Sequence, residues 1–452
     1  MNERRKANWI QEFVLECAPK CESPERFLYW AAVSTIAGAV RRRCYVDMGQ
    51  VTWYPNWYIL LVGDPGLVKK STSIGMALSC LREVPGVHFG SDNVTWQDFV
   101  QEIDEAHDDF SISPPGTDIL DQTYTQTRAI TYSISEFGTF FEAKNLALVN
   151  MLTEFWDGKS QPFKKGTKTQ GDNIIVQPFV NLIAGTTPRW IAMNFKEHFG
   201  GWGLSSRFVF LHAKYKSKDV PFPDELWGER MHTWQDDFIH DLALMTTMQG
   251  KMEVTQGYRE LARPYYEKLG SRQTSMAKHP HANPWIKYFL ARKFDHIMKL
   301  AIILSISEGE SYKLEAHHWR EAAFQVDCIE DEMAEIFEGK IKPQKQLLYD
   351  DVRKGIANGI VIRGGRLSLV EAARYAYEWM DGNQTKDVIN QLIVSQYVVK
   401  TQDMVDGQEY LELTDIGRQV LLEPRRDVAE DLAARGEGLS FSLLSSLTPG
   451  DE

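Results

Sequence analysis

Residues 57–72 of the chain read WYILLVGDPGLVKKST. The apolar run from Trp57 to Val62 predicts a buried strand, and a helical pattern follows the segment. Glycines at Gly63 and Gly66 lie in the loop between them, just before a Lys-Ser pair. This order of parts is typical of a phosphate cradle, because bare backbone N–H groups must approach the phosphate oxygens closely.

The residues of this loop can be matched to the parts of a P-loop nucleotide site. Lys70 is predicted to hold the β- and γ-phosphates of ATP, and Ser71 to be the Mg²⁺ ligand. With Lys69 as the phosphate lysine, Lys70 would occupy the hydroxyl position, so that register is rejected. In the strict pattern GxxxxGK[ST] the glycine positions fall on Asp64 and Lys69, so the two glycines are out of register. The predicted nucleotide-binding residues are Gly63, Asp64, Pro65, Gly66, Val68, Lys69, Lys70, Ser71 and Thr72.

Size and composition exclude several classes of protein. The 452 residues allow two to four domains, and 43% hydrophobic and 25% charged residues are typical of a soluble protein. The sequence contains no long uncharged apolar stretch and no secretory signal, which predicts a cytoplasmic protein without membrane contact. The five cysteines are scattered, so we expect reduced thiols and no zinc site. A net charge of −12 argues against broad coating of DNA but not against a local basic contact.

Alternating apolar runs and helical segments predict an α/β fold. The expected strands are Trp57–Val62, Val87–Gly90, Ala129–Ser135, Val180–Ala184 and Arg207–Leu211. The expected domains are a helical N-terminal segment at 1–50, a P-loop ATPase core at 51–215, a helical lid at 216–340, a winged helix at 344–425 and a disordered acidic tail at 426–452. Arg41–Arg43 is predicted to be a solvated helix end, with contacts to acidic neighbours or nucleic acid as the alternative.

The winged-helix prediction depends on the order of elements after residue 343. Gln344–Ala357 is predicted to be a helix, a capping box at Ser368 opens a second, and Thr385–Ser395 forms a third. An alternating hairpin over Gln396–Leu413 and a closing helix over Thr414–Leu422 follow. Such modules contact DNA or protein, and both alternatives stay open.

Hydrolysis needs a group that activates water, and Glu136 at the end of a predicted strand is the candidate. Ser135 precedes it where an aspartate that binds metal is usual, which brings hydrolysis into question but not nucleotide binding. Another strand ends in Thr186-Thr187-Pro188. Thr187, with Thr186 as the alternative, is the predicted sensor of the γ-phosphate.

Two arginines are candidates for charge stabilisation. Arg207 begins a predicted edge strand, from which it can reach the nucleotide of a neighbouring subunit as a finger. Arg292, with Lys293 as the alternative, is the predicted phosphate sensor on the helical lid.

Lysines between the two catalytic strands predict a DNA contact. A hairpin is expected with Gln161–Lys165 paired to Asn173–Gln177. Lys164, Lys165 and Lys168 are the candidate ligands of the DNA backbone, and their contacts would be salt-dependent and independent of base sequence.

From about Phe27 to Phe337 the chain resembles a P-loop family of uncharacterised domains found in phages and integrated elements. The matching pieces are Pro55–Gly63, Lys70-Ser71-Thr72, Ser135-Glu136-Phe137-Gly138, Phe155-Trp156-Asp157-Gly158, Gly185-Thr186-Thr187-Pro188 and Ser206-Arg207-Phe208. Members often accompany or are fused to primases and are described as replicative helicases. The Ser-Arg-Phe segment, lid and winged helix are also similar to minichromosome-maintenance helicases. That likeness implies Arg207 as a finger acting in trans and Arg292 as a lid sensor.

Residues and resemblance together predict an ATPase of the ASCE class, AAA+ or RecA-like, that forms a ring, expected to be a hexamer. We expect it to act on single-stranded or forked DNA in phage or mobile-element replication, in the bacterial cytoplasm. No primase motif is visible, so a separate primase or polymerase is the expected partner. The alternatives are a protein remodeller or helicase loader, and a nucleotide-binding scaffold with impaired hydrolysis.

Overall fold

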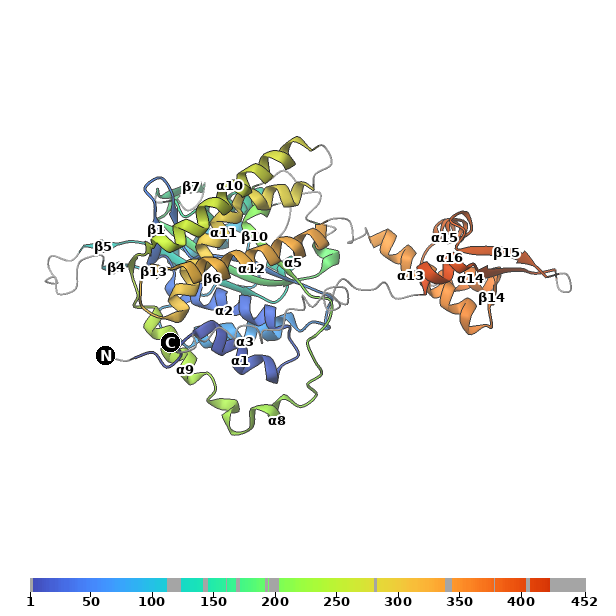
Figure 1. Ribbon diagram of the computed structural model, residues 1–452, viewed down its shortest axis with the longest axis horizontal. Coiled ribbons are helices and arrows are strands. Elements are labelled where there is room, and N and C mark those ends of the chain that lie inside the picture. Colours follow the sequence, from blue (N-terminus) through green and yellow to red (C-terminus); the bar gives the residue numbers. More distant parts are fainter. Residues whose placement is uncertain are drawn as a thin grey trace. The chain divides into compact units, whose positions relative to one another are not determined.

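The computed structural model forms two compact units, Met1–Ile341 and Lys342–Glu452, each with its own hydrophobic core (Figure 1). No helix among the described residues is long and apolar enough to span a membrane. The structure describes residues 3–111, 123–140, 145–159, 161–167, 171–191, 194, 203–279, 283–337, 344–377, 379–403 and 407–422.

A four-stranded sheet with the strand order β10-β3-β9-β6 lies at the centre of the first unit. The strands are β3 (Tyr58–Val62), β6 (Arg128–Ile134), β9 (Pro178–Thr186) and β10 (Phe208–His212). Nearly all of their residues are buried, which explains why each strand reads as a continuous apolar run. The predicted α/β class is therefore confirmed.

All four strands run in the same direction. Tyr58 at the start of β3 lies beside Phe208, and Val62 at its end lies beside Thr186 and His212. The carboxyl ends of the strands therefore meet at one edge of the sheet, and the amino ends meet at the other.

Helices cover the sheet. In Figure 1, α1 (Trp9–Cys17), α2 (Glu25–Val40) and α3 (Lys70–Arg82) lie below the strands, whereas α10 (Gln256–Lys278) and α11 (Pro284–Glu308) lie above them. Helices α2 and α3 pack on each other and on β9, and α12 (Ala316–Glu335) packs on β10. The remaining elements of this unit are η1 (Ala18–Lys20), β1 (Cys44–Asp47), β2 (Thr52–Trp53), α4 (Trp96–Glu105), β4 (Phe110–Ser111), β5 (Tyr124–Thr125), α5 (Phe137–Phe140), α6 (Leu146–Trp156), β7 (Phe163–Thr167), β8 (Gly171–Ile175), η3 (Ser205–Arg207), α8 (Pro223–Trp227), η4 (Gly228–His232), α9 (Asp236–Met245), β11 (Gly250–Lys251), β12 (Glu253–Val254) and β13 (Lys313–Leu314).

Four of the five predicted strands are present, and the strand predicted at Val87–Gly90 is wrong. That segment pairs with β6 only through one parallel bridge, Phe89 to Thr131. Its backbone is packed onto an aromatic ring, since a Cβ at Gly90 would lie 2.0 Å from the Tyr132 ring. The segment therefore contributes a single bridge to the sheet.

The solvated helix end predicted at Arg41–Arg43 is also wrong, because Arg41 and Arg42 are buried. Arg41 adopts a left-handed φ of 57° where α2 ends, and its guanidinium lies 2.7 Å from the Asp108 carboxylate. The Arg42 guanidinium lies 3.8 Å from the centre of the Tyr54 ring. These arginines therefore connect the end of α2 to later parts of the chain.

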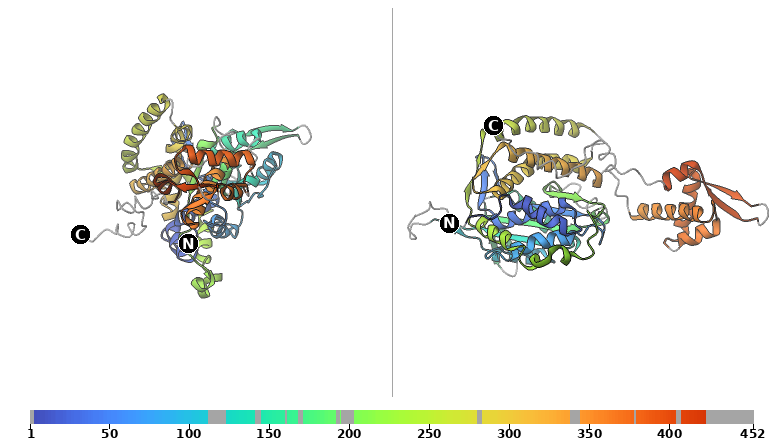
Figure 2. Two further views of the ribbon diagram at one scale, coloured as in Figure 1. Left: turned by 90° about the vertical axis from the view of Figure 1, so that its right-hand side faces the viewer. Right: turned by 60° about the horizontal axis from the view of Figure 1, so that its bottom comes forward.

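The predicted hairpin between β6 and β9 is confirmed as β7 and β8, and it projects from the first unit in the left view of Figure 2. Lys165 pairs with Asn173, which is the predicted register, although both strands lie closer to the turn than expected. The base of the hairpin packs through Phe163, whose ring centre lies 5.1 Å from that of Phe155.

The second unit contains the predicted order of helices and strands. Its elements are α13 (Gln344–Ile362), β14 (Arg366–Ser368), α14 (Leu369–Tyr377), α15 (Gly382–Val394), β15 (Val398–Gln402), β16 (Glu409–Leu413) and α16 (Asp415–Leu421). The capping box is present, because the Glu371 N–H donates to Ser368 Oγ and the Ser368 N–H donates to the Glu371 carboxylate. The predicted tail lies outside the described residues.

Replacing Asp108 by Ala is expected to destabilise the first unit by about 3–5 kcal/mol, because it leaves the buried Arg41 guanidinium without its carboxylate. Arg43 loses the same partner, which it contacts at 2.6 Å. Denaturant unfolding followed by circular dichroism measures the change. The control is Glu154→Ala, which removes an exposed pair with Lys159 and is expected to cost less than about 1 kcal/mol. Equal losses in the two variants would contradict the prediction.

Candidate active site

The loop after β3 has an unusual backbone at Gly63, Gly66 and Lys69. Gly63 cannot be replaced without a clash, because a Cβ there would lie 2.3 Å from the Val68 side chain. Gly66 and Lys69 adopt left-handed φ angles of 71° and 51°, and α3 begins at Lys70. Among the described residues, the N–H groups of Val68, Lys69 and Lys70 donate no hydrogen bond. These free donors at the start of a helix fit the oxygens of a phosphate.

Lys70 supplies a cation at the same place. Its ammonium is buried and donates to the Gly63 carbonyl oxygen at 2.6 Å. Burial lowers the pKa of Lys70, whereas the carboxylates of Glu136 and Asp64 raise it, and the net direction is downward. A buried ammonium whose nearest acceptors are carbonyl oxygens fits a phosphate ligand.

Lys69 lies on the outer side of the loop. Its ammonium is 3.2 Å from the Glu22 carboxylate, and its carbonyl oxygen accepts a hydrogen bond from Ser23. Hydrogen bonds from Lys216 and from the Val220 N–H lower the pKa of Glu22 to about 2. The Glu22 carboxylate is therefore charged at neutral pH and can pair with Lys69. This geometry supports Lys70, and not Lys69, as the phosphate lysine.

Glu136 follows β6 at the carboxyl edge of the sheet, and its side chain is exposed. Partial loss of hydration raises the pKa of Glu136, and the charge of Lys70 opposes this rise. The two charged groups are therefore electrostatic neighbours. A carboxylate with a raised pKa is a suitable base for a water molecule.

Close approach of β9 brings these groups together. A Cβ at Gly185 would lie 2.5 Å from the Ser135 carbonyl oxygen and 3.5 Å from Cε of Lys70. Gly185 therefore permits Lys70 and the segment of Glu136 to lie on one face of the sheet. Neither the spacing nor the composition of the sequence indicated this role.

Thr186 and Thr187, the two alternatives for the phosphate sensor, differ in burial and in direction. The Thr186 hydroxyl is fully buried, whereas Thr187 is partly exposed. Because side chains alternate along a strand, Thr186 points away from the face on which Gly185 meets Lys70. Thr187 Oγ1 accepts a hydrogen bond from the Trp190 N–H at 3.1 Å, and its own proton stays available to a ligand.

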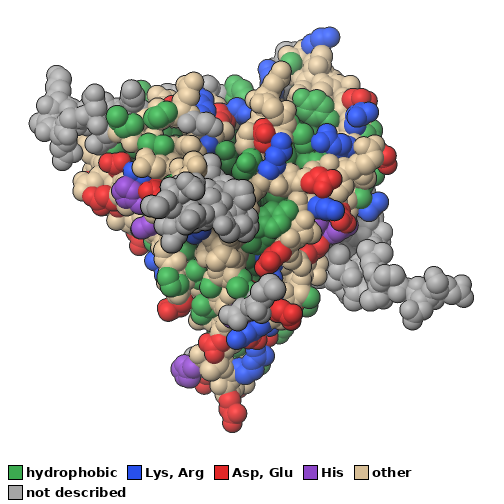
Figure 3. Space-filling model, turned by 90° about the vertical axis from the view of Figure 1, so that its left-hand side faces the viewer, with side chains coloured by type: hydrophobic (Ala, Val, Ile, Leu, Met, Phe, Trp, Pro, Cys, Tyr) green, Lys and Arg blue, Asp and Glu red, His purple; other side chains and the backbone are tan. Residues whose placement is uncertain are grey.

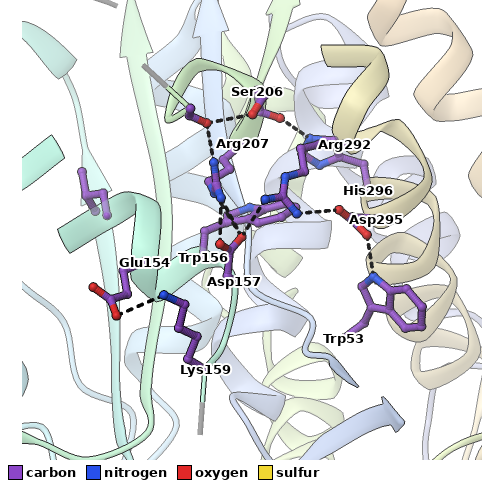
Figure 4. Close-up of polar contacts among 12 residues, drawn as sticks. Trp53, Glu154, Trp156, Asp157, Lys159, Ser206, Arg207, Arg292, Asp295 and His296 are labelled. Carbon is purple, nitrogen blue, oxygen red and sulfur yellow. Dashed lines mark hydrogen bonds and ion pairs between the residues drawn. The ribbon is translucent and has the colours of Figure 1, made fainter. Parts of the chain in front are cut away.

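The two arginines predicted to stabilise charge, Arg207 and Arg292, lie away from the loop after β3. Arg207 is buried and forms a bidentate pair with Asp157, with its Nη2 atom 2.7 Å from Oδ2 (Figure 4). Arg292 lies 3.5 Å from the same carboxylate and 3.1 Å from Asp295. Asp157 is thus a shared partner of both arginines. The sequence marked the Phe155–Gly158 segment as part of the family resemblance but did not indicate this role of Asp157.

Arg207 and Lys70 are at opposite edges of the sheet. Arg207 directly precedes β10, whose first residue pairs with Tyr58 at the start of β3. The loop follows the last residue of β3, and a strand of five residues spans about 15 Å. Neither Arg207 nor Arg292 therefore contacts the loop of its own chain. Their predicted roles toward a neighbouring nucleotide stay predictions.

The predicted DNA lysines are only partly placed. Lys164 and Lys165 lie in β7, opposite Ile174 and Asn173. Lys168 lies outside the described residues.

The position of Ser71 is consistent with Mg²⁺ binding. Ser71 in the first turn of α3 is exposed and can offer a hydroxyl oxygen to Mg²⁺ beside bound phosphates. A second cluster, Glu308 with His317 and His318, has a structural explanation. His318 Nδ1 accepts the Glu315 N–H, which leaves its proton on Nε2, where it is donated to Glu308.

No protein-family model matches the chain, and a search of curated proteins finds no match. The family resemblance therefore stays a prediction, and functional conclusions must come from the geometry of the site.

Replacing Glu136 by Gln is expected to stabilise the protein at pH 8 and to change its stability less at pH 4. The raised pKa means that the folded state binds the proton more tightly than the unfolded state, so the charged form costs stability as pH rises through the ordinary value for glutamate. Thermal unfolding at both pH values measures the difference.

The matched test repeats the substitution in a Lys70→Met background. Lys70 favours the charged carboxylate, so the stabilisation by Glu136→Gln at pH 8 should be larger without it. A destabilised Glu136→Gln protein at pH 8 would contradict the assignment.

Proposed function

We propose that the chain is a Mg²⁺-dependent ATPase whose active site is the loop from Gly63 to Thr72. The observation that carries this proposal is the meeting of Lys70, Glu136 and Thr187 at the carboxyl edge of a parallel sheet. Ligands of open α/β sheets bind at this edge. Strand β9, which leads to Thr187, lies between β3 and β6, so Thr187 lies between the phosphate loop and the proposed base.

The residues divide the reaction among them. Lys70 and the free loop N–H groups hold the β- and γ-phosphates, and Glu136 accepts a proton from the attacking water. Thr187 donates a hydrogen bond from its hydroxyl to the terminal phosphate. Mg²⁺, held by Ser71 and phosphate oxygens, would neutralise charge on the phosphates. Ser135 brings no charge to the metal, which predicts slow turnover.

A second copy of the chain completes the proposed site. Asp157 holds Arg207 and Arg292 together at the edge that lies away from their own loop. Two guanidinium groups around one carboxylate can bind a terminal phosphate in its place. A ring, expected to be a hexamer, supplies this arrangement when the amino edge of one subunit meets the loop of the next.

We propose that DNA is the substrate on which the motor acts. The β7–β8 hairpin carries Lys164 and Lys165 away from the sheet. The helical part after β10 is proposed as the lid, and the second unit as a winged helix, on the order of its elements. In this proposal the protein is a helicase or translocase of phage or mobile-element replication.

Lys70→Ala is expected to abolish ATP binding, because the buried cation is lost. Glu136→Gln is expected to bind ATP and to hydrolyse it about 10²–10⁴-fold more slowly. A triple Ala variant of Lys164, Lys165 and Lys168 is expected to keep basal turnover and to lose stimulation by single-stranded DNA. Calorimetric ATP titration and phosphate release with and without DNA test these outcomes.

The matched control for the hairpin replaces the exposed lysines Lys218, Lys278 and Lys313 by Ala, which removes the same charge elsewhere. Absence of ATP binding would refute the whole proposal. ATP turnover that ignores DNA would reject the helicase and favour a remodeller or loader. ATP binding without turnover would favour the scaffold.

A mixture of two inactive variants tests the shared site. Arg207→Ala is expected to lower turnover by about 10³–10⁵-fold in pure form, and Lys70→Ala abolishes it. Mixed in equal amounts, they should regain activity at about a quarter of the interfaces, where an intact loop meets an intact Arg207. Steady-state ATP hydrolysis measures the gain.

The control is a mixture of Lys70→Ala with Glu136→Gln. Both residues lie on the loop side, so this mixture cannot restore an intact loop and should stay inactive. Equal behaviour of the two mixtures would exclude a role for Arg207 in trans.

A further inference from the structure

A half-open cavity of about 510 Å³ lies between α10, α11 and the β1–β2 segment, away from the proposed phosphate loop. Its volume is in the range of pockets that bind small molecules. Its lining includes Trp53, Tyr258, Arg259, Arg263, Tyr266 and Phe294.

The wall of this cavity is apolar because its polar atoms have partners. The Tyr258 hydroxyl donates to the sulfur of Met298 at 3.2 Å. Trp53 Nε1 donates to Asp295 at 2.8 Å. The Phe294 ring adds a further apolar surface and lies 6.3 Å from the Trp53 ring. Most of the accessible surface inside is therefore carbon.

Large hydrophobic side chains are exposed around the cavity. Met48, Val51 and Tyr266 have exposed fractions of 39%, 46% and 59%. In Figure 3, hydrophobic side chains lie among Lys and Arg side chains at the upper right, in the region of α10. Such apolar surface costs free energy in water and indicates a ligand.

Two arginines of α10 give the cavity a positive rim. Arg259 and Arg263 are one helical turn apart, and among the described residues neither pairs with a carboxylate. Arg259 donates to the Val254 carbonyl oxygen and to the sulfur of Met48. The acidic residue of the lining, Asp295, already pairs with Arg292 at 3.1 Å. The rim therefore has an uncompensated positive charge.

We propose that this cavity binds a small amphipathic anion, with its apolar body in the cavity and a carboxylate, sulfonate or phosphate on Arg259 and Arg263. Burial of the body removes carbon surface from water, and the arginines bind the anionic group by charge-assisted hydrogen bonds. A cation of the same shape meets like charge at the rim. The proposal does not depend on ATP binding at the loop.

Calorimetric titration of the full chain with dodecanoate and with dodecyltrimethylammonium, below their micelle concentrations, tests the charge preference. We expect saturable binding of one dodecanoate and at least tenfold weaker binding of the cation. The double variant Arg259→Ala/Arg263→Ala should weaken dodecanoate binding at least tenfold. The double variant Lys278→Ala/Arg320→Ala removes the same charge outside the cavity and should leave binding unchanged.

A filling variant locates the site. Ala291 lines the cavity and is exposed, so Ala291→Trp should occupy the space and abolish binding while the thermal unfolding midpoint stays close to the wild-type value. Lys70→Ala should bind dodecanoate as the wild type does. Equal affinity for both probes, or unchanged affinity in the double or filling variant, would overturn the proposal. Self-association that Ala291→Trp disrupts, without dodecanoate binding, would identify a second copy as the occupant and would also overturn it.

Discussion

Because β3, β6, β9 and β10 run in one direction, residues that follow β3, β6 and β9 lie at one edge of the sheet and residues that precede the strands lie at the other. The strands are buried on both faces, as is usual for parallel strands covered by helices. Their common direction brings Lys70, Glu136 and Thr187 to one edge, and Arg207 to the opposite one. A site that needs both sets of residues therefore requires two copies of the chain.

Buried polar side chains also lie at the edge of the sheet where the amino ends of the strands meet. Lys299 on α11 donates to the Asn56 side chain at 2.5 Å and to the Trp156 carbonyl oxygen at 3.0 Å. Burial lowers the pKa of Lys299. His296, one turn earlier, contacts the Ser206 carbonyl oxygen at 3.0 Å, next to Arg207. Helix α11 is thus fastened to the segments that hold Asp157 and Arg207, so a displacement of this helix would move the arginine pair.

Local patterns predicted well where neighbouring residues decide the conformation. The capping box at Ser368 was predicted correctly, as was the pairing of Lys165 with Asn173. The predictions failed where distant residues decide. Arg41–Arg43 reads as a solvated run, yet Asp108 and Tyr54 surround it. The Val87–Gly90 segment reads as a strand, yet it pairs with β6 through one bridge and packs against the Tyr132 ring.

The sequence by itself indicated the glycine- and lysine-containing loop after β3, the order of the strands along the chain, and Lys70 and Glu136 as candidate site residues. These follow from hydrophobic runs and from glycine and lysine within a few residues of each other, which act locally. Only the tertiary structure decided that Gly185 lets Lys70 approach the segment of Glu136, and that Asp157 gathers Arg207 and Arg292. Those contacts join segments separated by tens to more than a hundred residues, and no periodicity in the chain records which carboxylate a buried arginine will meet.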